Sequence, residues 1–277
     1  MKRSTSLLLV FSTLLMVLSS LIMTSCSNTV ENNNFSIYFF NAGKADSCVI
    51  SDGEHNIMID TGESTLTADI LSYFSQNKIT KLDCLIITHF DKDHVGSASA
   101  IIENIAVDTV FQSNVPKDSE YYTAYLNALE KKDITPTTVS GNYDLTLGEM
   151  TIQINGSQTV YEKNESNNSS LITSLFYGDT SFIFMGDAQN DRLKDFIAQN
   201  SNTYDFVKIP SHGNYQKQLD NLLKSINPQY AVITSSKEEP EEESMTDLLD
   251  EMGIKYYLTR AGDITVTSDK TNITVTQ

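Results

Sequence analysis

Apolar and polar residues alternate along residues 35–154 at spacings that predict short strands and amphipathic helices in turn. Three β-rich runs separated by turn residues predict an antiparallel meander over residues 35–40, 47–51 and 56–60. A continuous apolar run then predicts a buried strand over residues 82–88, directly before His89. Helical spacing is found on both sides of that strand, over residues 65–76, 95–105 and 119–132.

The second half of the chain repeats this alternation after a polar stretch, residues 155–170, that is expected to form a loop. Gly178-Asp179-Thr180 separates two apolar runs and predicts a β-hairpin. The acidic run at residues 238–243 favours the start of a helix, because acidic side chains stabilise a helix N-terminus. A dedicated acidic metal patch is the alternative. The other expected elements are helices over residues 190–199, 216–226 and 245–252 and strands over residues 107–111, 206–209, 230–234, 256–258 and 264–266.

The first 26 residues have the pattern of a secretory signal and not that of a structural element. Lys2 and Arg3 precede an apolar run over residues 7–23, and small residues follow that run. Met23-Thr24-Ser25-Cys26 resembles a bacterial lipobox, in which the cysteine is lipidated and becomes the new N-terminus. An uncleaved anchor helix is the alternative, and either arrangement would hold the protein on the extracellular face of the cell membrane. We expect a lipoprotein signal peptide over residues 1–25, a tether over residues 26–34 after lipidation of Cys26, and one domain over residues 35–277.

The charge of the chain argues against a protein that coats nucleic acid, and its cysteines argue against a disulfide. The chain has 19 basic and 36 acidic residues, and loss of Lys2 and Arg3 with the signal takes its formal charge from −17 to −19. Such an acidic chain lacks the basic stripe of a protein that coats nucleic acid. Cys48 and Cys84 lie in apolar, strand-like runs, so we expect two buried free thiols in preference to a disulfide.

The residues that carry chemistry gather just after the predicted buried strand. Two His and two Asp fall within six residues, at His89, Asp91, Asp93 and His94. Alternate residues of such a loop can face one ion and the adjacent pair another, which is the density that a dinuclear metal site requires. A solvated polar turn is the alternative. Three more candidates follow apolar strands, each within two residues of a glycine, at Asp60, Asp187 and His212.

These residues resemble the hallmark of the metallo-β-lactamase fold superfamily, H-x-H-x-D-H, which an Asp-Gly strand end precedes and an Asp and a final His follow. Residues 89–94 read H-x-D-x-D-H, so Asp91 replaces the second His of the hallmark. The distal His of the family is absent from residues 167–171, where it would be expected. That segment, residues 41–47 and residues 257–266 are similar to the soluble domain of ComEC-type competence proteins.

The resemblance implies a four-layer αββα sandwich with two divalent metal ions, Zn²⁺ or Mn²⁺, at the edge of its sheets. His89 and Asp91 would hold one ion, and Asn168, Ser169 or water would complete that site unless it stands partly empty. Three His and three Asp form a harder ligand set than five His, which shifts the expected ion towards Mn²⁺. The other expected ligands are Asp93, His94 and His212 at the second ion, with Asp187 bridging the two.

Further roles follow from the same resemblance. Asp60 would orient the loop ligands from behind, and Asp93 and Asp187 would be the catalytic residues. Lys44 and Lys92 would lie near the site and offset the charge of a phosphate, although two solvated surface lysines are the alternative.

The activity that the resemblance implies is metal-dependent hydrolysis by a metal-bound hydroxide, most directly of a phosphodiester. A charge of −19 would repel a long duplex, so we expect a small or single-stranded substrate. Two alternatives stay open. One is a hydrolase of ester, thioester or lactone bonds, since the fold does not choose among these reactions. The other is a non-catalytic surface lipoprotein with a degenerate metal site.

Overall fold

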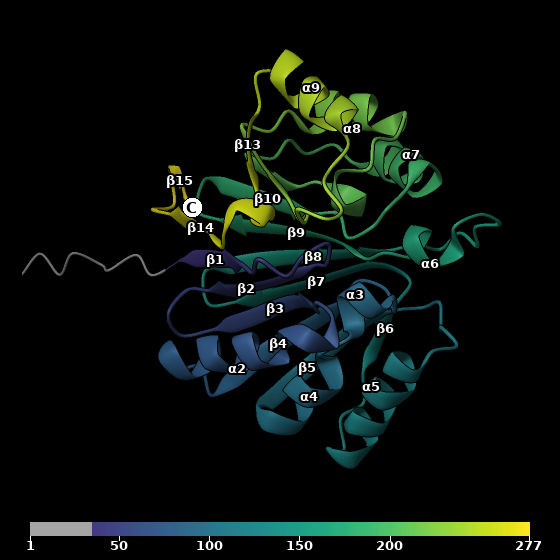
Figure 1. The fold of residues 1–277 in the computed structure, drawn as a ribbon, viewed down its shortest axis with the longest axis vertical. Coiled ribbons are helices and arrows are strands. Elements are labelled where there is room, and N and C mark those ends of the chain that lie inside the picture. Colours follow the sequence, from purple (N-terminus) through teal and green to yellow (C-terminus); the bar gives the residue numbers. More distant parts are fainter. Residues whose placement is uncertain (1–34) are drawn as a thin grey trace, which may run out of the picture. The chain divides into compact units, whose positions relative to one another are not determined.

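The computed structural model describes residues 35–277, and these residues form four layers. Two β-sheets pack face to face, and helices cover the outer face of each sheet (Figure 1). This arrangement is the αββα sandwich, so the expected fold class is confirmed. The signal peptide, the tether and the lipidation site Cys26 lie outside the described residues and stay predictions.

The first sheet contains the first six strands of the domain and its last two. Its eight strands lie in the order β15-β14-β1-β2-β3-β4-β5-β6. β1, β2 and β3 pair antiparallel, which confirms the predicted meander, and β3 to β6 then run parallel. The strands are β1 (Ser36–Phe39), β2 (Ser47–Ser51), β3 (Asn56–Thr61), β4 (Lys81–Ile87), β5 (Ala106–Ser113), β6 (Thr137–Val139), β14 (Ile264–Ser268) and β15 (Ile273–Thr276).

The second sheet has seven strands in the order β13-β12-β11-β10-β9-β8-β7. β9 and β10 form the hairpin predicted around Gly178, and β10 to β13 run parallel. The parallel strands of both sheets therefore direct the chain that follows them towards an edge of the sandwich. The strands are β7 (Gly141–Leu147), β8 (Met150–Gly156), β9 (Ile172–Tyr177), β10 (Thr180–Phe184), β11 (Phe206–Lys208), β12 (Tyr230–Ile233) and β13 (Lys255–Leu258).

The helices lie where the 3.6-residue spacing predicts them, with two differences. The helix expected over residues 95–105 is interrupted at residues 96–97, where Gly96 packs so closely against the backbone of Ser64 that a side chain would not fit. The loop expected over residues 155–170 contains a single helical turn. The helices are α2 (Thr67–Gln76), α3 (Lys92–Val95), α4 (Ala98–Asn104) and α5 (Glu120–Lys131) on the first sheet, and α6 (Glu165–Asn168), α7 (Asn190–Gln199), α8 (Gln218–Ile226) and α9 (Glu243–Glu251) with the second. Short 3₁₀ turns are η1 (Ser64–Leu66), η2 (Pro210–Gly213) and η3 (Thr259–Ala261).

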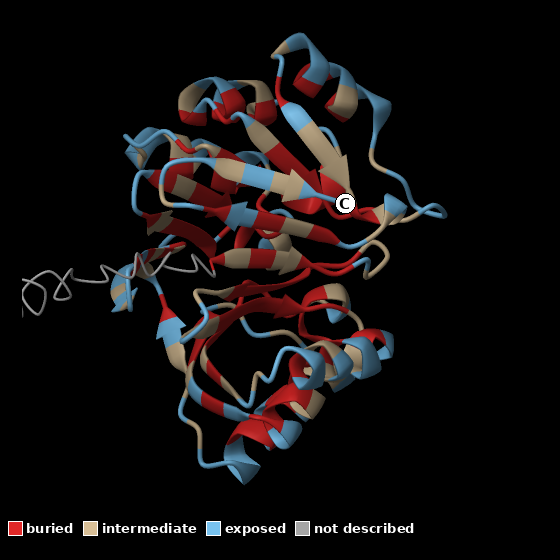
Figure 2. Ribbon diagram, turned by 90° about the vertical axis from the view of Figure 1, so that its left-hand side faces the viewer, coloured by how far each residue is buried: buried red, intermediate tan, exposed pale blue. Residues whose placement is uncertain are grey.

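Three apolar clusters hold the layers together. The central one joins the two sheets and includes stacked aromatic rings such as Phe39 against Phe184. The other two lie between each sheet and its helices, and buried residues follow the strands accordingly (Figure 2). Cys48 and Cys84 are buried free thiols within the central cluster, as predicted. Along residues 35–277, no helix is both long and apolar enough to cross a membrane.

The acidic run has a structural role in this packing. α9 begins at Glu243, which confirms the predicted helix start. Glu241 from the same run pairs with Arg260, at 2.9 Å between Oε1 and Nη2, and accepts a hydrogen bond from Ser235. The run therefore joins the start of α9 to η3.

Candidate metal centre

The predicted metal ligands come together at the edge of the sandwich to which the parallel strands point. Asp60 is the penultimate residue of β3, and the segment 89–94 follows β4. Asp187 follows β10, and His212 lies in η2 after β11. Backbone strain marks two of these positions, since Asp60 and His212 have φ values of 53° and 54°. Non-glycine residues adopt such angles where the surrounding structure enforces them, often at functional sites.

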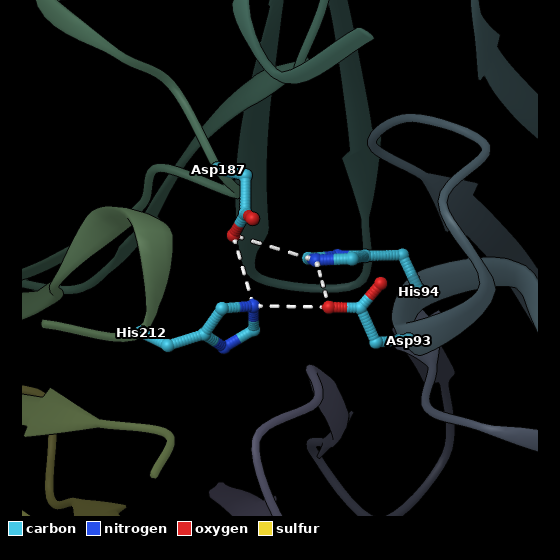
Figure 3. Close-up of side chains that lie close together, drawn as sticks. All are labelled: Asp93, His94, Asp187 and His212. Carbon is cyan, nitrogen blue, oxygen red and sulfur yellow. Dashed lines mark ion pairs between the residues drawn. The ribbon is translucent and has the colours of Figure 1, made fainter. Parts of the chain in front are cut away.

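Four side chains form the centre of the site, and we call them the quartet: Asp93, His94, Asp187 and His212 (Figure 3). Asp187 Oδ1 lies 3.3 Å from His212 Nε2 and 3.4 Å from His94 Nε2. Asp93 Oδ2 lies 3.3 Å from His212 Nε2 and 3.8 Å from His94 Nε2. One atom from each residue thus faces a common point, and the four atoms lie within 4.8 Å of one another.

The quartet fits a divalent metal ion because its buried polar atoms lack other partners. Among the described residues, His94 Nε2, His212 Nε2 and Asp187 Oδ1 are buried and accept or donate no hydrogen bond. Leaving such atoms unpaired costs about 1–3 kcal/mol each. Two imidazole nitrogens and two carboxylate oxygens are a ligand set that divalent ions bind. The residues therefore form a metal site of His and Asp ligands.

Groups behind the quartet orient its imidazoles. Asp60 accepts hydrogen bonds from the Thr88 backbone N–H at 2.8 Å and from its hydroxyl at 2.7 Å. The other contact of Asp60 is His94 Nδ1, at 2.8 Å, which directs the free Nε2 of His94 towards the quartet. His212 Nδ1 lies 3.1 Å from the hydroxyl of Thr234. Asp60 thus lies behind the ligands, in the place expected for it.

Electrostatics in the metal-free protein favour charged carboxylates and protonated imidazoles. Burial alone would lower the pKa of His212, but Asp187 and Asp46 outweigh it and raise that pKa to about 9. Burial alone would also lower the pKa of His94, but Asp187 and Asp60 outweigh it and raise that pKa well above its ordinary value. Burial would raise the pKa of Asp187, yet His212 and His94 hold it well below the usual range. A metal ion at the quartet therefore replaces bound protons.

A buried ion pair behind the quartet escapes sequence analysis. Lys208 binds Asp46 and donates a hydrogen bond to the Gly186 carbonyl at 3.3 Å. Asp46 also accepts a hydrogen bond from the Thr234 hydroxyl at 2.6 Å. Asp46, Asp60 and His94 could by spacing hold an ion, but Lys208 already neutralises Asp46. The sign of this pair in the sequence is Lys208, a lysine within the apolar strand predicted over residues 206–209.

His89 and Asp91, the ligands expected at the other ion, form a half-site beside the quartet. His89 Nε2 lies 3.7 Å from Asp91 Oδ1 and has no hydrogen-bond partner among the described residues. Lys117 Nζ lies 2.5 Å from Asp91 Oδ1, and Ser166 donates a hydrogen bond to the same oxygen. Burial by itself raises the pKa of Asp91, but His89, Lys117 and Ser166 together lower it. Sequence analysis missed Lys117 and Ser166, for which the chain offers no local signal.

Asn168 and Ser169 direct their side chains to backbone groups and not to the half-site they were expected to complete. Asn168 donates to the Lys163 carbonyl at 2.9 Å and accepts from the Gln189 N–H at 3.1 Å. Ser169 donates to the Ser166 carbonyl at 2.6 Å. These bonds satisfy the turn at α6, so the two side chains stabilise the loop instead. From the same segment, the Ser170 hydroxyl lies 3.4 Å from His89 Nδ1.

The two lysines expected to contact substrate have different surroundings. Lys92 pairs with Glu63 at 3.0 Å and its side chain is 62% exposed. Lys44 is half-buried in the loop between β1 and β2. Their role in substrate binding stays a prediction.

Comparisons with known proteins agree with this geometry. Residues 41–235 match the family model of the metallo-beta-lactamase superfamily. The chain is 23% identical over 174 residues to ComE operon protein 3 of Bacillus subtilis, which is 61% of this chain and 22% of that protein. It is 24% identical over 200 residues to Recombination protein 2 of Haemophilus influenzae, which is 69% of this chain and 23% of that protein. The chain therefore matches less than a quarter of the length of either relative.

A solved structure shares the architecture. The metallo-beta-lactamase fold protein YhfI from Bacillus subtilis superposes with a TM-score of 0.56 at 12% identity, over 87% of this chain and all of that one. Such low identity supports the fold alone. The family match, the sandwich and the His/Asp metal site together show that this chain belongs to the metallo-beta-lactamase superfamily.

Proposed function

We propose that the protein is a phosphodiesterase that acts on a small or single-stranded phosphodiester. The observation that carries the proposal is the quartet, in which Asp187 lies between two buried imidazoles with unpaired nitrogens. A divalent ion bound there, Mn²⁺ or Zn²⁺, would supply Lewis acidity to a water molecule and to a phosphoryl oxygen. The ComEC-like segments of the chain and its two curated relatives support the choice of a phosphodiester.

The residues of the chain contribute orientation and proton handling. Asp60 and Thr234 hold the two imidazoles of the quartet in the orientation that leaves each Nε2 facing inward. Asp93 is the most exposed member of the quartet, at 23% of its side chain, and so can accept a hydrogen bond from an attacking water. Asp187 is buried and serves to hold the ion. Attack opposite the leaving oxygen would then break the P–O bond.

The charge of the chain argues for a short substrate. Non-specific binding of a duplex depends on Lys and Arg side chains that neutralise its phosphates. The chain has 19 such residues against 36 acids. The metal site provides local attraction for one phosphate group, whereas the rest of the surface repels a long polyanion.

A substrate screen tests this function. The purified protein, loaded with Mn²⁺ or Zn²⁺, should hydrolyse bis(p-nitrophenyl) phosphate or a short single-stranded DNA, and Asp187→Ala should hydrolyse neither. Failure on both substrates would contradict the proposal. Hydrolysis of p-nitrophenyl acetate, a thioester or a lactone, without any phosphodiester cleavage, would support the ester-hydrolase alternative. Absence of a bound ion would favour a degenerate site.

We also propose that the enzyme is anchored to the extracellular face of the membrane by a lipid on Cys26. The support is the lipobox-like sequence that follows the charged and apolar N-terminal segment. Expressed in a bacterium with labelled palmitate, the wild-type protein should carry label and sediment with membranes. Cys26→Ala should lose the label, and an unlabelled wild-type protein would contradict the anchor.

A further inference from the structure

The half-site of His89 and Asp91 borders the quartet but has fewer ligands for a metal ion. The rings of His89 and His94 lie 4.1 Å apart between centroids, so the half-site adjoins the quartet directly. The half-site contributes one unpaired imidazole nitrogen and one carboxylate. Stable zinc or manganese sites in proteins usually have three or more protein ligands. As a metal site of its own, the half-site is therefore incomplete.

Asp91 is already neutralised by other side chains of the chain. Both Lys117 and Ser166 contact Asp91 Oδ1, which is also the oxygen that lies 3.7 Å from His89 Nε2. A carboxylate oxygen has two lone-pair directions, and here each has a donor. The oxygen could coordinate an ion only if Lys117 or Ser166 left it.

Lys117 lies where a substrate can reach it. It belongs to the segment between β5 and α5, and its side chain is 35% exposed, whereas the imidazoles of the quartet are buried. Lysine presents a compact charge on a flexible stem and binds phosphate oxygens well. The ammonium thus occupies the place where a second ion would otherwise balance the charge of Asp91.

We propose that the centre works with one divalent ion, held by the quartet, and that Lys117 binds a phosphate oxygen of the substrate in place of a second ion. The proposal rests on the proposed phosphodiesterase function. When an anionic phosphate ester enters, the ammonium turns from Asp91 to a non-bridging oxygen, and Ser166 remains hydrogen-bonded to Asp91. The ligand class is a phosphate ester or its inorganic phosphate product.

The chemical step balances without a further reactant. The oxygen of water forms a bond to phosphorus, and the P–O bond to the leaving group breaks. The water loses one proton to solvent and the leaving oxygen gains one. Lys117 transfers no proton and acts through its charge, which offsets negative charge on the phosphoryl oxygens.

Metal content and phosphate binding test the proposal independently of turnover. Wild type, Lys117→Met, Lys117→Arg and the control Lys131→Met are loaded with Mn²⁺, desalted and analysed for metal, and inorganic phosphate binding is measured by calorimetry. Lys131 is a suitable control because it pairs with Glu103 at the end of α5, on an exposed surface. We expect one ion per chain in wild type. Lys117→Met should retain that ion and bind phosphate about tenfold to a hundredfold more weakly, as for loss of one charged hydrogen bond.

The remaining variants separate charge from bulk. Lys117→Arg should keep most of the phosphate affinity, and Lys131→Met should match wild type. In a phosphodiester assay, Lys117→Met should raise KM more than it lowers kcat. Two tightly held ions per wild-type chain, or phosphate affinity unchanged in Lys117→Met, would overturn the proposal. If phosphate binding weakens as expected but no phosphodiester is cleaved, the Lys117 site is supported and the phosphodiesterase function fails.

Discussion

The quartet and the half-site, the two halves of the metal centre, differ in whether other side chains already satisfy their polar atoms. In the quartet, three atoms with no other partner are buried around a common point. In the half-site, Asp91 is 26% exposed and is paired with Lys117 and Ser166. The first half is therefore built for an ion that the chain does not supply, whereas the second half is largely satisfied by the chain itself. Sequence motif alone treats the two halves as equals, and their surroundings separate them.

The largest expected effect comes from a matched pair of substitutions, Asp187→Ala in the quartet and Asp91→Ala in the half-site. Asp187→Ala should lose the ion and lower the hydrolysis rate by at least about a thousandfold, because the ion carries the Lewis-acid chemistry. Asp91→Ala should keep the ion. Metal analysis and a phosphodiester assay on both variants check this, and equal loss of metal would remove the distinction between the halves.

The buried pair behind the quartet gives the next effect, this time on stability. Lys208→Met leaves Asp46 charged and without its ammonium, so we expect the free energy of unfolding to fall by about 3–5 kcal/mol. Chemical denaturation of the metal-free protein measures this loss. Lys208→Met combined with Asp46→Asn should recover part of it. A double variant as unstable as the single one would mean that the pair does not act as a unit.

A substitution at Asp60 tests how strongly the residues behind the quartet control its affinity for a metal ion. Asp60→Asn keeps the shape of the side chain but weakens its hold on His94 Nδ1. Outer partners of this kind change metal affinity by about tenfold to a hundredfold. Competition with a fluorescent chelator should show that loss in Asp60→Asn. The control Asp83→Asn alters a carboxylate on β4 that pairs with Lys81 and should leave metal affinity unchanged.

The smallest expected effect is on pH dependence. The pKa of His212 is raised to about 9 in the metal-free protein. A raised pKa stabilises the folded state below the unfolded value near 6.5 and loses that contribution as pH rises through about 9. The metal-free protein should therefore melt at a lower temperature at pH 9.5 than at pH 6.5 in part through His212, and Mn²⁺ should bind more tightly as pH rises over that range.

Two measurements check the sign. Calorimetric titration of Mn²⁺ in buffers of different ionisation enthalpy should detect proton release, since bound ions displace protons from ligands. His212→Gln should release fewer protons and lose part of the pH dependence of melting. Proton release that is absent in wild type would contradict the electrostatics described for the quartet.

Much of the fold was predictable because it follows local periodicity. The meander, the hairpin at Gly178 and the start of α9 depend on residues that are close in sequence, and each was predicted. The interruption at residues 96–97 was not predicted, and there Gly96 packs against a distant part of the chain, the backbone at Ser64. Local pattern thus gives the elements, and contacts between elements set their exact limits.

The site was predictable to the same extent. The segment 89–94 stood out because its ligands are neighbours in sequence, and strand ends marked Asp187 and His212. Lys117 lies 26 residues from its partner Asp91, and Lys208 lies 162 residues from Asp46. A sequence can mark one member of such a pair, as with Lys208 in an apolar strand, but it does not show the distant partner. The pair of Lys117 and Asp91 is also a feature that separates the half-site from the quartet.

Anomalous diffraction at the manganese edge, from crystals of the whole protein grown with Mn²⁺, tests the central distinction most directly. The account predicts one strong peak, bounded by Asp93, His94, Asp187 and His212, with Lys117 still beside Asp91. A second peak of comparable height between His89 and Asp91, or the absence of a peak at the quartet, would contradict it.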